Sequence, residues 1–381
     1  MILKKRKRLG IVWAVCCMAS ACVGNIAQQS AHPEKNGNPI YDGLGIVPVD
    51  GGFKQDDYWV WGSSIVKGDD GKYHMYVSRW PKILKFHPGW MVASEIAHAV
   101  SDTAVGPYTF SDVALGARSP QYWDGCSQHN PKVFRHGDTY ILYYMGSTHP
   151  FDDAREHPEE VTLGSKYSIV GRSNKRIGVA TSKSPYGPWT RMDKPVLDTK
   201  PDTFYSFLTS NPTPVIHEDG SVLLIFKSRT YNESFPFQSD MMLGVATAPH
   251  YTGPYTVVKD EPIFSETRFG VVEDPYLWLD DDGYHMLAKD MRGKLVNQSH
   301  CGFLAHSENG LDWTLDEHPL AYTKEIRWDD GKTVEMGQLE RVQGLIEDGV
   351  LTHLSYAVMD GPGGFSNGSN TWAIVVPLDA E

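Results

Sequence analysis

Residues 62–79 read GSSIVKGDDGKYHMYVSR, which is an apolar strand, an Asp/Gly turn and a second strand of aromatic and β-branched residues. This composition and spacing are typical of a β-hairpin. The same pattern returns four more times along the chain, at 129–147, 210–229, 273–291 and 340–358. Five copies of one hairpin predict a repeat architecture, which a large β-sandwich would not produce.

A second pattern follows each of the first four hairpins. It consists of a third strand, a turn containing Gly-Pro or Gly-Leu, and a fourth strand that an aromatic residue opens. After the fifth hairpin, residues 371–378 supply a third strand without this turn, and we expect the missing outer strand to come from residues 40–47. Four strands in each of five units predict an all-β fold, a five-bladed β-propeller with four-stranded antiparallel blades over residues 40–381. The four copies of the second pattern lie at 98–110, 178–191, 244–257 and 303–315.

The first 21 residues carry the features of a lipoprotein signal peptide. Residues 4–8 are all basic, residues 9–18 are mostly apolar, and small residues then precede Cys22. Such a segment is cleaved during export and is too short to remain as a membrane span. We expect Cys22 to be lipidated and the polar residues 22–39 to form a flexible tether. This predicts a bacterial lipoprotein in the periplasm or anchored to the outer membrane, and the alternative is an ordinary signal peptide cut nearby.

The charge of the chain argues against nucleic acid as a partner. The formal net charge is −12, and it becomes −17 without residues 1–21, which hold five basic and no acidic side chains. No basic stripe offsets this charge. Beyond Cys22 only Cys126 and Cys301 remain, which is no disulfide framework and no zinc-binding pattern, so we expect two buried thiols and no metal or cofactor.

The residues that open the inner strands are the candidates for chemistry, because these strands line the channel of a propeller and meet at one end of its axis. Asn130, Asn211 and Asp274 each precede a proline, which needs no ladder partner for its missing N–H, and we expect their side chains to face the axis. Backbone capping by Asn and Asp explains part of this repetition. Glu273 and Glu340 should gather beside Asp274. Carboxylates held together push their pKa values apart, as the acid and base of glycoside hydrolysis require.

These openings, together with the sequence Leu339-Glu340-Arg341, resemble those of five-bladed glycoside hydrolases. The similar families are family 43, which contains arabinofuranosidases and xylosidases, and family 117, which contains anhydro-galactosidases of red-algal polysaccharide. The resemblance implies that Asp274 and Glu340 correspond to the blade-four aspartate and blade-five glutamate of family 117. It also implies an exo-acting hydrolase that releases a terminal sugar from a plant or algal oligosaccharide.

One position departs from these families, which usually place a general-base aspartate at the start of the blade-one inner strand. This chain has Gly62 there, and Asp57 lies five residues upstream. Either Asp57 reaches the axis, or Asp274 takes the role of the base, or the protein is a non-catalytic glycan-binding surface lipoprotein. His129 is a further candidate for the general acid, and the alternative is a hydrogen-bonded residue of the channel wall. Because some family 43 propellers hold calcium near a histidine, His129 is also the only indication of a divalent cation.

The other candidates surround the same strand openings and would bind the substrate. Basic residues near the ends of second strands, Arg79, Lys227, Arg229 and Arg292, would bind a sulfate, a carboxylate or a phosphate, or pair with neighbouring acids. A phosphate-dependent phosphorolytic enzyme is therefore a third hypothesis. Trp80 and Trp90 are candidate sugar platforms or core residues, and the insert 149–175 is expected to wall the pocket or to contact another subunit. The complete predicted substrate-binding set is Asp124, Asn130, Asn211, Glu273, Arg341, Arg79 and Trp123.

Overall fold

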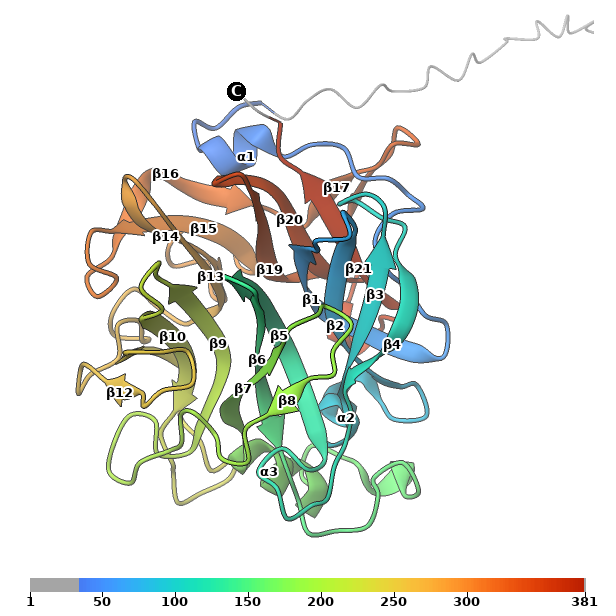
Figure 1. Cartoon of the computed structure of the whole chain (residues 1–381), viewed down its shortest axis with the longest axis vertical. Coiled ribbons are helices and arrows are strands. Elements are labelled where there is room, and N and C mark those ends of the chain that lie inside the picture. Colours follow the sequence, from blue (N-terminus) through green and yellow to red (C-terminus); the bar gives the residue numbers. More distant parts are fainter. Residues whose placement is uncertain (1–33, 380–381) are drawn as a thin grey trace, which may run out of the picture.

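Five antiparallel sheets stand around one axis in the computed structural model, which describes residues 34–379 (Figure 1). The all-β five-bladed propeller predicted from the repeats is confirmed. Each sheet runs in chain order from the inner to the outer strand, and each predicted hairpin forms the two inner strands of one blade. The predicted signal peptide and Cys22 lie outside the described residues.

The strands of the first four blades follow the repeats closely. Blade one contains β1 (Tyr58–Lys67), β2 (Tyr73–Pro81), β3 (Glu95–Ser101) and β4 (Thr109–Leu115). Blade two contains β5 (Ser127–His136), β6 (Thr139–Ser147), β7 (Arg176–Ser182) and β8 (Thr190–Arg191). Blade three contains β9 (Leu208–Ile216), β10 (Val222–Arg229), β11 (Met242–Ala248) and β12 (Thr256–Val257). Blade four contains β13 (Val272–Asp280), β14 (Gly283–Asp290), β15 (Cys301–Ser307) and β16 (Thr314–Tyr322).

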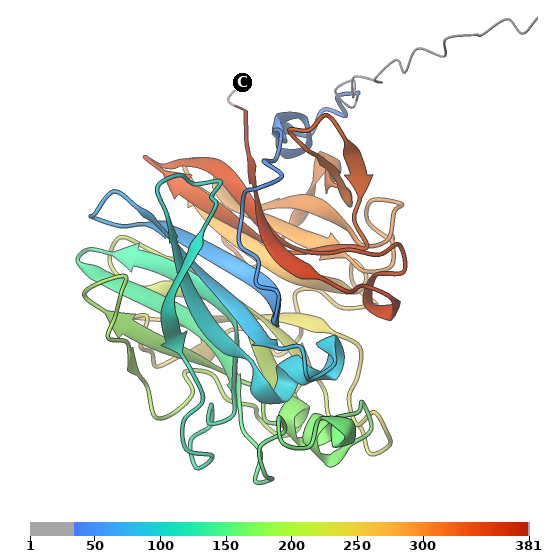
Figure 2. The same cartoon turned by 90° about the vertical axis from the view of Figure 1, so that its right-hand side faces the viewer.

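Blade five closes the ring because the C-terminal strands pair there with a segment from the N-terminal part of the chain. It contains β19 (Gln338–Glu347), β20 (Val350–Met359) and β21 (Thr371–Pro377). The N-terminal segment runs along the outer edge of β21, where Leu44 bridges Leu378 and Phe53 bridges Ala373 (Figure 2). The expected fourth strand is thus replaced by two isolated bridges, since part of residues 40–47 forms the short helix α1 (Pro39–Gly43).

Apolar side chains fill the spaces between neighbouring blades. The largest cluster joins blades four and five and contains Tyr276, Leu304, Leu354 and Val376. Separate clusters join the other neighbouring pairs of blades. Each blade is therefore held by apolar contacts on both of its faces, while its inner strand borders the axis.

Two short helices cover one end of the ring. α2 (Phe86–Ala93) connects β2 to β3, and α3 (Lys166–Ser173) lies in the long insert between β6 and β7, against α2 (Figure 1). The remaining elements are the hairpin β17 (Glu325–Arg327) and β18 (Thr333–Glu335) and the 3₁₀ turns η1 (Pro158–Glu160) and η2 (Gly364–Ser366). Within residues 34–379, no helix has the length and apolar character needed to cross a bilayer.

Removing the Phe53 side chain tests the closure of the ring. Phe53 is buried beside Ala373, so Phe53→Ala should lower the free energy of unfolding by about 3–5 kcal/mol. Val49 lies in the same segment but is half exposed, so Val49→Ala should change it by less than about 0.5 kcal/mol. Urea unfolding measures both values, and equal effects of the two substitutions would contradict closure by this segment.

Candidate active site

All five innermost strands bulge at one shared position. The residues there are Gly62, Asn130, Asn211, Asp274 and Arg341, and each has a φ between 47° and 61°. Glycine, asparagine and aspartate adopt this left-handed region readily, whereas an arginine there is uncommon. We call these five residues the axial belt.

Hydrogen bonds connect the axial belt from blade two to blade five. The Asn130 side-chain amide donates to Asn211 over 3.0 Å, and the Asn211 amide donates to Oδ1 of Asp274 over 3.0 Å. The Arg341 guanidinium donates to the same oxygen of Asp274. The predicted residues Asn130, Asn211, Asp274 and Arg341 are therefore brought together, and their contacts hold four blades in register at the axis.

Arg341 lies beside Gly62, the blade-one residue where an aspartate was expected. A Cβ atom at Gly62 would lie 3.3 Å from Cγ and 3.5 Å from Cβ of Arg341. A side chain on Gly62 would therefore pack closely against Arg341, which would have to shift by only a few tenths of an ångström. Asp57 does not replace the expected aspartate, because Asp57 is exposed and lies outside the residues that line the cavity described below.

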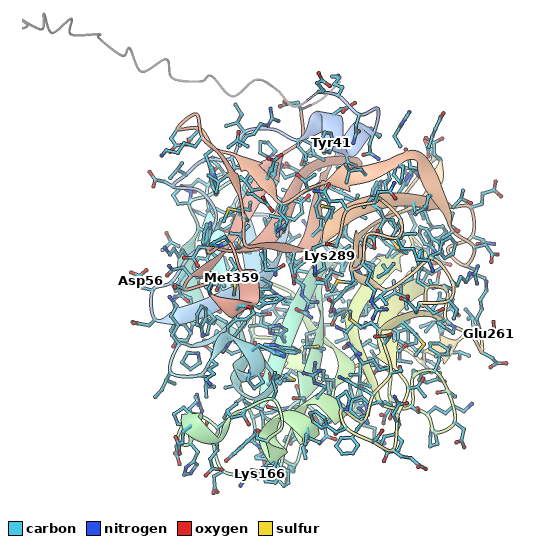
Figure 3. The ribbon with its side chains drawn as sticks, turned by 180° about the vertical axis from the view of Figure 1, so that it is seen from behind. Tyr41, Asp56, Lys166, Glu261, Lys289 and Met359 are labelled. Carbon is cyan, nitrogen blue, oxygen red and sulfur yellow. The ribbon has the colours of Figure 1, made fainter. Side chains whose placement is uncertain are left out.

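A buried lysine gathers the three predicted carboxylates. Nζ of Lys289 on β14 lies 2.7 Å from Glu340, 3.8 Å from Glu273 and 3.8 Å from Asp274, and Figure 3 shows Lys289 in the interior of the molecule. Lys227 also contacts Glu273, over 2.5 Å. The contact of Lys289 with Glu340 is an ion pair without the angles of a hydrogen bond. Buried carboxylates need such partners to remain charged.

The pKa values of Glu340 and Glu273 are shifted in opposite directions. Burial, together with the negative charges of Asp274 and Glu273, raises the pKa of Glu340 despite its contact with Lys289. For Glu273, burial raises the pKa, but the opposing charges of Lys227, Lys289 and Arg341 outweigh it and hold the pKa well below its usual range. One carboxyl is thus favoured as an acid and the other as an ionised carboxylate.

The residue before the axial belt faces a cavity in four blades. Trp61, His129, Glu273 and Glu340 all line a cavity of about 220 Å³, which Arg341 also lines. Asp274 does not line this cavity and lies behind Arg341 in the axial belt. Glu340 and Glu273 are therefore the carboxyl groups that a bound molecule would meet, although the sequence indicated Asp274 rather than Glu273 as catalytic.

The cavity has an aromatic wall and a charged wall. Trp61, Phe86 and Phe365 pack together, with ring centroids 4.9–5.9 Å apart, and Trp90 completes this side. Aromatic faces pack against the apolar face of a sugar ring, while charged groups bind its hydroxyls. Trp80 is fully buried, and the Trp90 ring already contacts His129 at 4.9 Å and the Lys175 ammonium at 3.8 Å. The charged wall consists of Arg172, Lys175, Lys227, Arg229, Glu273, Glu340 and Arg341.

His129 reaches the cavity in a state unsuited to donating a proton. Its Nδ1 lies 2.8 Å from Ser94 Oγ, and its ring stacks on Trp90 at 4.9 Å. Burial, reinforced by the charges of Arg341, Lys175 and Lys227, holds the pKa of His129 well below its usual range. The imidazole is therefore neutral and serves as part of the wall.

Three predicted substrate-binding residues lie away from the cavity. Asp124 is fully buried and pairs with Arg118 over 2.6 Å, Arg79 pairs with Glu95 over 2.7 Å, and Trp123 packs on Tyr144. Each contributes to packing within or beside its own blade. Arg292 likewise pairs with Asp240 and Glu266 on the surface.

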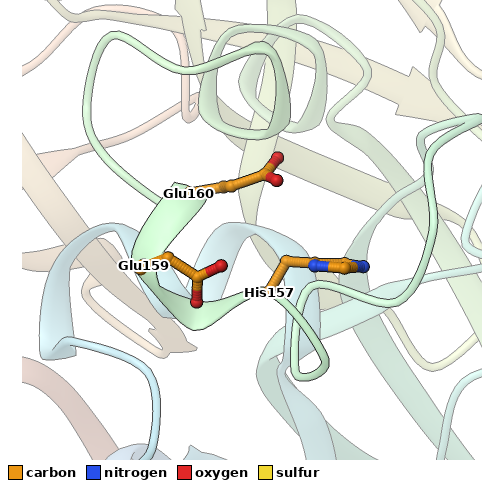
Figure 4. A group of neighbouring side chains, drawn as sticks. All are labelled: His157, Glu159 and Glu160. Atoms are coloured by element: carbon orange, nitrogen blue, oxygen red, sulfur yellow. The ribbon is translucent and has the colours of Figure 1, made fainter.

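The two thiols and one group of metal-ligand side chains also lie outside the cavity. Cys301 is buried as expected, but Cys126 is only half-buried, and neither forms a disulfide. Within residues 34–379, His157, Glu159 and Glu160 have ligand atoms within 4.8 Å of one another (Figure 4). They belong to the insert rather than to the channel, and both glutamates are exposed.

Lys289, Lys175 and Arg172 are site residues that the sequence reasoning missed. Lys289 interrupts the apolar run MLAKD at residues 286–290, and a lysine in an inner-blade strand was the available signal. Lys175 and Arg172 lie in the insert, where residue pattern alone does not reveal which side chains turn toward the axis.

Solved structures of known proteins share the fold of this chain. No protein-family model and no curated protein matches the chain. Among solved structures, a family 117 glycoside hydrolase, Zg3597 of the marine bacterium Zobellia galactanivorans, is 17% identical with a TM-score of 0.59, over 88% of this chain and 89% of that one. A structure described as a glycoside hydrolase is 12% identical with a TM-score of 0.63, over 90% and 94%.

A third similar structure is CoXyl43, a β-xylosidase/α-arabinofuranosidase from a compost microbial metagenome, in complex with xylotriose. It is 15% identical with a TM-score of 0.54, over 86% of this chain and 93% of that one. The predicted resemblance to the propellers of families 43 and 117 is thereby confirmed at the level of the fold. The protein is a five-bladed β-propeller with a pocket at one end of its axis.

Replacing Lys289 tests the charge balance at the axis. Lys289→Met leaves Glu340 without a cation, so the free energy of unfolding should fall by about 3–5 kcal/mol at pH 8. The loss should shrink at pH 5, because protonation of the carboxyl removes the unpaired charge. Lys332→Met, which removes an exposed ion pair with Asp330, should cost less than about 1 kcal/mol at either pH. A loss for Lys289→Met that does not depend on pH would contradict this account.

Proposed function

We propose that the protein is an exo-acting glycoside hydrolase that releases a terminal sugar from a plant or algal oligosaccharide. The observation that carries the proposal is the pair Glu340 and Glu273, which face one cavity and whose pKa values move in opposite directions. Glycoside hydrolysis needs one carboxylic acid and one carboxylate on either side of the bond that breaks. The similarity to solved glycoside hydrolases is consistent with this chemistry.

In the proposed reaction, Glu340 donates its proton to the glycosidic oxygen as the bond to the anomeric carbon breaks. Glu273 accepts a proton from the water whose oxygen joins that carbon, so one water is consumed for each sugar released. The Lys227 contact must loosen as Glu273 takes up this proton, because a neutral carboxylic acid no longer needs the ammonium. Transfer of a proton back to Glu340 restores the starting state.

The size of the cavity supports the exo mode. Its volume of about 220 Å³ is below the roughly 300–1,000 Å³ of sites for larger ligands. Residues of α2 and the insert, together with Phe365, contribute to its lining. Such a space suits one sugar unit rather than the interior of a long chain. With the predicted signal peptide and lipidated Cys22, we place this activity in the periplasm or at the outer membrane.

Glycan binding without catalysis is the second candidate, and it also rests on an observation. Both cavity carboxylates are held by lysines, and blade one has Gly62 where an aspartate was expected. A site arranged in this way binds sugar hydroxyls well even if no proton is transferred. Turnover separates the two candidates.

Amide substitutions test the roles of the glutamates. Glu340→Gln and Glu273→Gln should each lower kcat by about 10²–10⁴-fold with little change in KM, because the amide keeps its shape but transfers no proton. Released monosaccharide from a panel of plant and red-algal oligosaccharides is measured by chromatography. Glu347→Gln is the matched control, since Glu347 lies at the far end of the same strand and pairs with Lys67. Binding without release by the wild type would instead support the second candidate.

The pH dependence of kcat/KM should reflect the raised pKa of Glu340 and the lowered pKa of Glu273. Activity should decline as the pH rises through the raised pKa of Glu340, because the acid must be protonated. It should persist below pH 4.5, the usual pKa of a glutamate, because the lowered pKa keeps Glu273 ionised there. Initial rates across the pH range provide the profile. An alkaline limb that remains unchanged in the residual activity of Glu340→Gln would assign the acid to another residue.

A further inference from the structure

Three cations of the cavity wall have no carboxylate partner. Lys227 pairs with Glu273, and Arg341 pairs with Asp274. Among the described residues, by contrast, no carboxylate oxygen lies within ion-pair distance of Arg172, Lys175 or Arg229. We call these three residues the cationic cluster.

The position of the cationic cluster is fixed by the fold. Arg172 lies in the last turn of α3, Lys175 lies just before β7, and Arg229 ends β10. Blade three and the insert of blade two thus meet at this side of the cavity. All three residues line the same cavity as Glu273 and Glu340.

The cluster is held in place rather than free in solvent. Lys175 is only 4% exposed, and its ammonium lies 3.8 Å from the centre of the Trp90 ring. The Arg229 guanidinium donates to the backbone carbonyl of Ser239. Solvent therefore does little to screen the charge of Lys175 from its neighbours.

Burial and mutual repulsion both lower the pKa values of these cations. Burial, together with the charges of Arg172, Lys227, Arg229 and Arg341, holds the pKa of Lys175 well below its usual range. Burial and the charge of Arg229 lower the pKa of Arg172 to about 10. An anion placed among these groups would relieve both effects.

The residues that line the cavity carry an excess of positive charge, whereas the whole protein is negatively charged. The chain carries a formal net charge of −12, whereas the cavity wall has five basic residues, Arg172, Lys175, Lys227, Arg229 and Arg341, against Glu273 and Glu340. A neutral sugar would not require this excess of positive charge. Arginine and lysine together are the residues that bind carboxylate and sulfate oxygens.

We propose that Arg172, Lys175 and Arg229 form an oxyanion subsite, and that the terminal sugar of the substrate is acidic, with a carboxylate or a sulfate group. This inference rests on the proposed function, because it names the substrate class of the same pocket. The anionic group lies against the cationic cluster while the sugar ring faces Glu273 and Glu340. Inorganic phosphate, which a phosphorolytic enzyme would bind, is the competing source of an oxyanion.

Binding of matched sugars tests the subsite. The probes are galactose, galacturonate and galactose 6-sulfate, then glucose, glucuronate and glucose 6-sulfate, and finally inorganic phosphate alone. Isothermal titration calorimetry with the purified full chain gives each Kd. In at least one of the two sets, an acidic member should bind at least tenfold more tightly than its neutral counterpart. Preference for glucuronate or galacturonate identifies a carboxylate, and preference for a 6-sulfate identifies a sulfate.

Substitutions connect that preference to the cluster. Lys175→Met and Arg172→Met should each weaken binding of the preferred acidic sugar by roughly 10- to 100-fold, as expected for loss of a charge-assisted hydrogen bond. Lys259→Met, which removes a surface lysine paired with Asp312, is the control and should leave the Kd unchanged. Thermal unfolding checks that each variant is folded. Since Arg172 is only half-buried, its variant keeps the test valid even if Lys175→Met fails to fold.

The absence of any preference for an acidic sugar in both sets would overturn the inference. Binding of phosphate that depends on Lys175 would in that case assign the cationic cluster to phosphate. Failure of the proposed hydrolase function would be recognised by a different result. Release of a neutral sugar that Glu340→Gln abolishes would uphold the hydrolase and reject the acidic substrate, whereas acidic preference without any turnover would do the reverse.

Discussion

The axial belt is the constraint on which the rest of the structure depends. Five inner strands bulge at one position in the left-handed region, and the side chains of Asn130, Asn211, Asp274 and Arg341 are linked across four blades. A bulge inserts one extra residue into a strand and thereby changes the direction in which the neighbouring side chains point. The residues just before the belt, including Glu273 and Glu340, therefore face the cavity, while Asp274 remains inside the ring.

The charges at the axis can be buried only because they compensate one another. Lys289 contacts three carboxylates, and Lys227 and Arg341 each neutralise one of them further. This arrangement also creates the difference between the glutamates, since Glu273 lies near more cations than Glu340 does. The same ion pairs thus stabilise the centre of the propeller and assign its acid and its carboxylate.

The helices and inserts on one end of the ring form part of the cavity wall. The propeller supplies the glutamates from its inner strands, which are parts of the repeat. Aromatic residues from α2 and cations from the region around α3 are additions to that repeat, so they can vary without altering the ring. In this protein the additions surround the carboxyl groups with positive charge, within an otherwise acidic chain.

The sequence by itself determined the fold, because the hairpin is a local pattern that occurs five times and the strand–turn–strand pattern with Gly-Pro or Gly-Leu occurs four times. It also located the axial belt, since Asn-Pro and Asp-Pro openings recur at equivalent places. Only the tertiary structure decided which residues meet in the cavity. Arg341 lies against Gly62, Lys289 contacts Glu340, and Lys175 lies near enough to Arg229 to feel its charge; each of these contacts joins two different blades. Such contacts come into being when the ring closes, and no spacing along the chain encodes them.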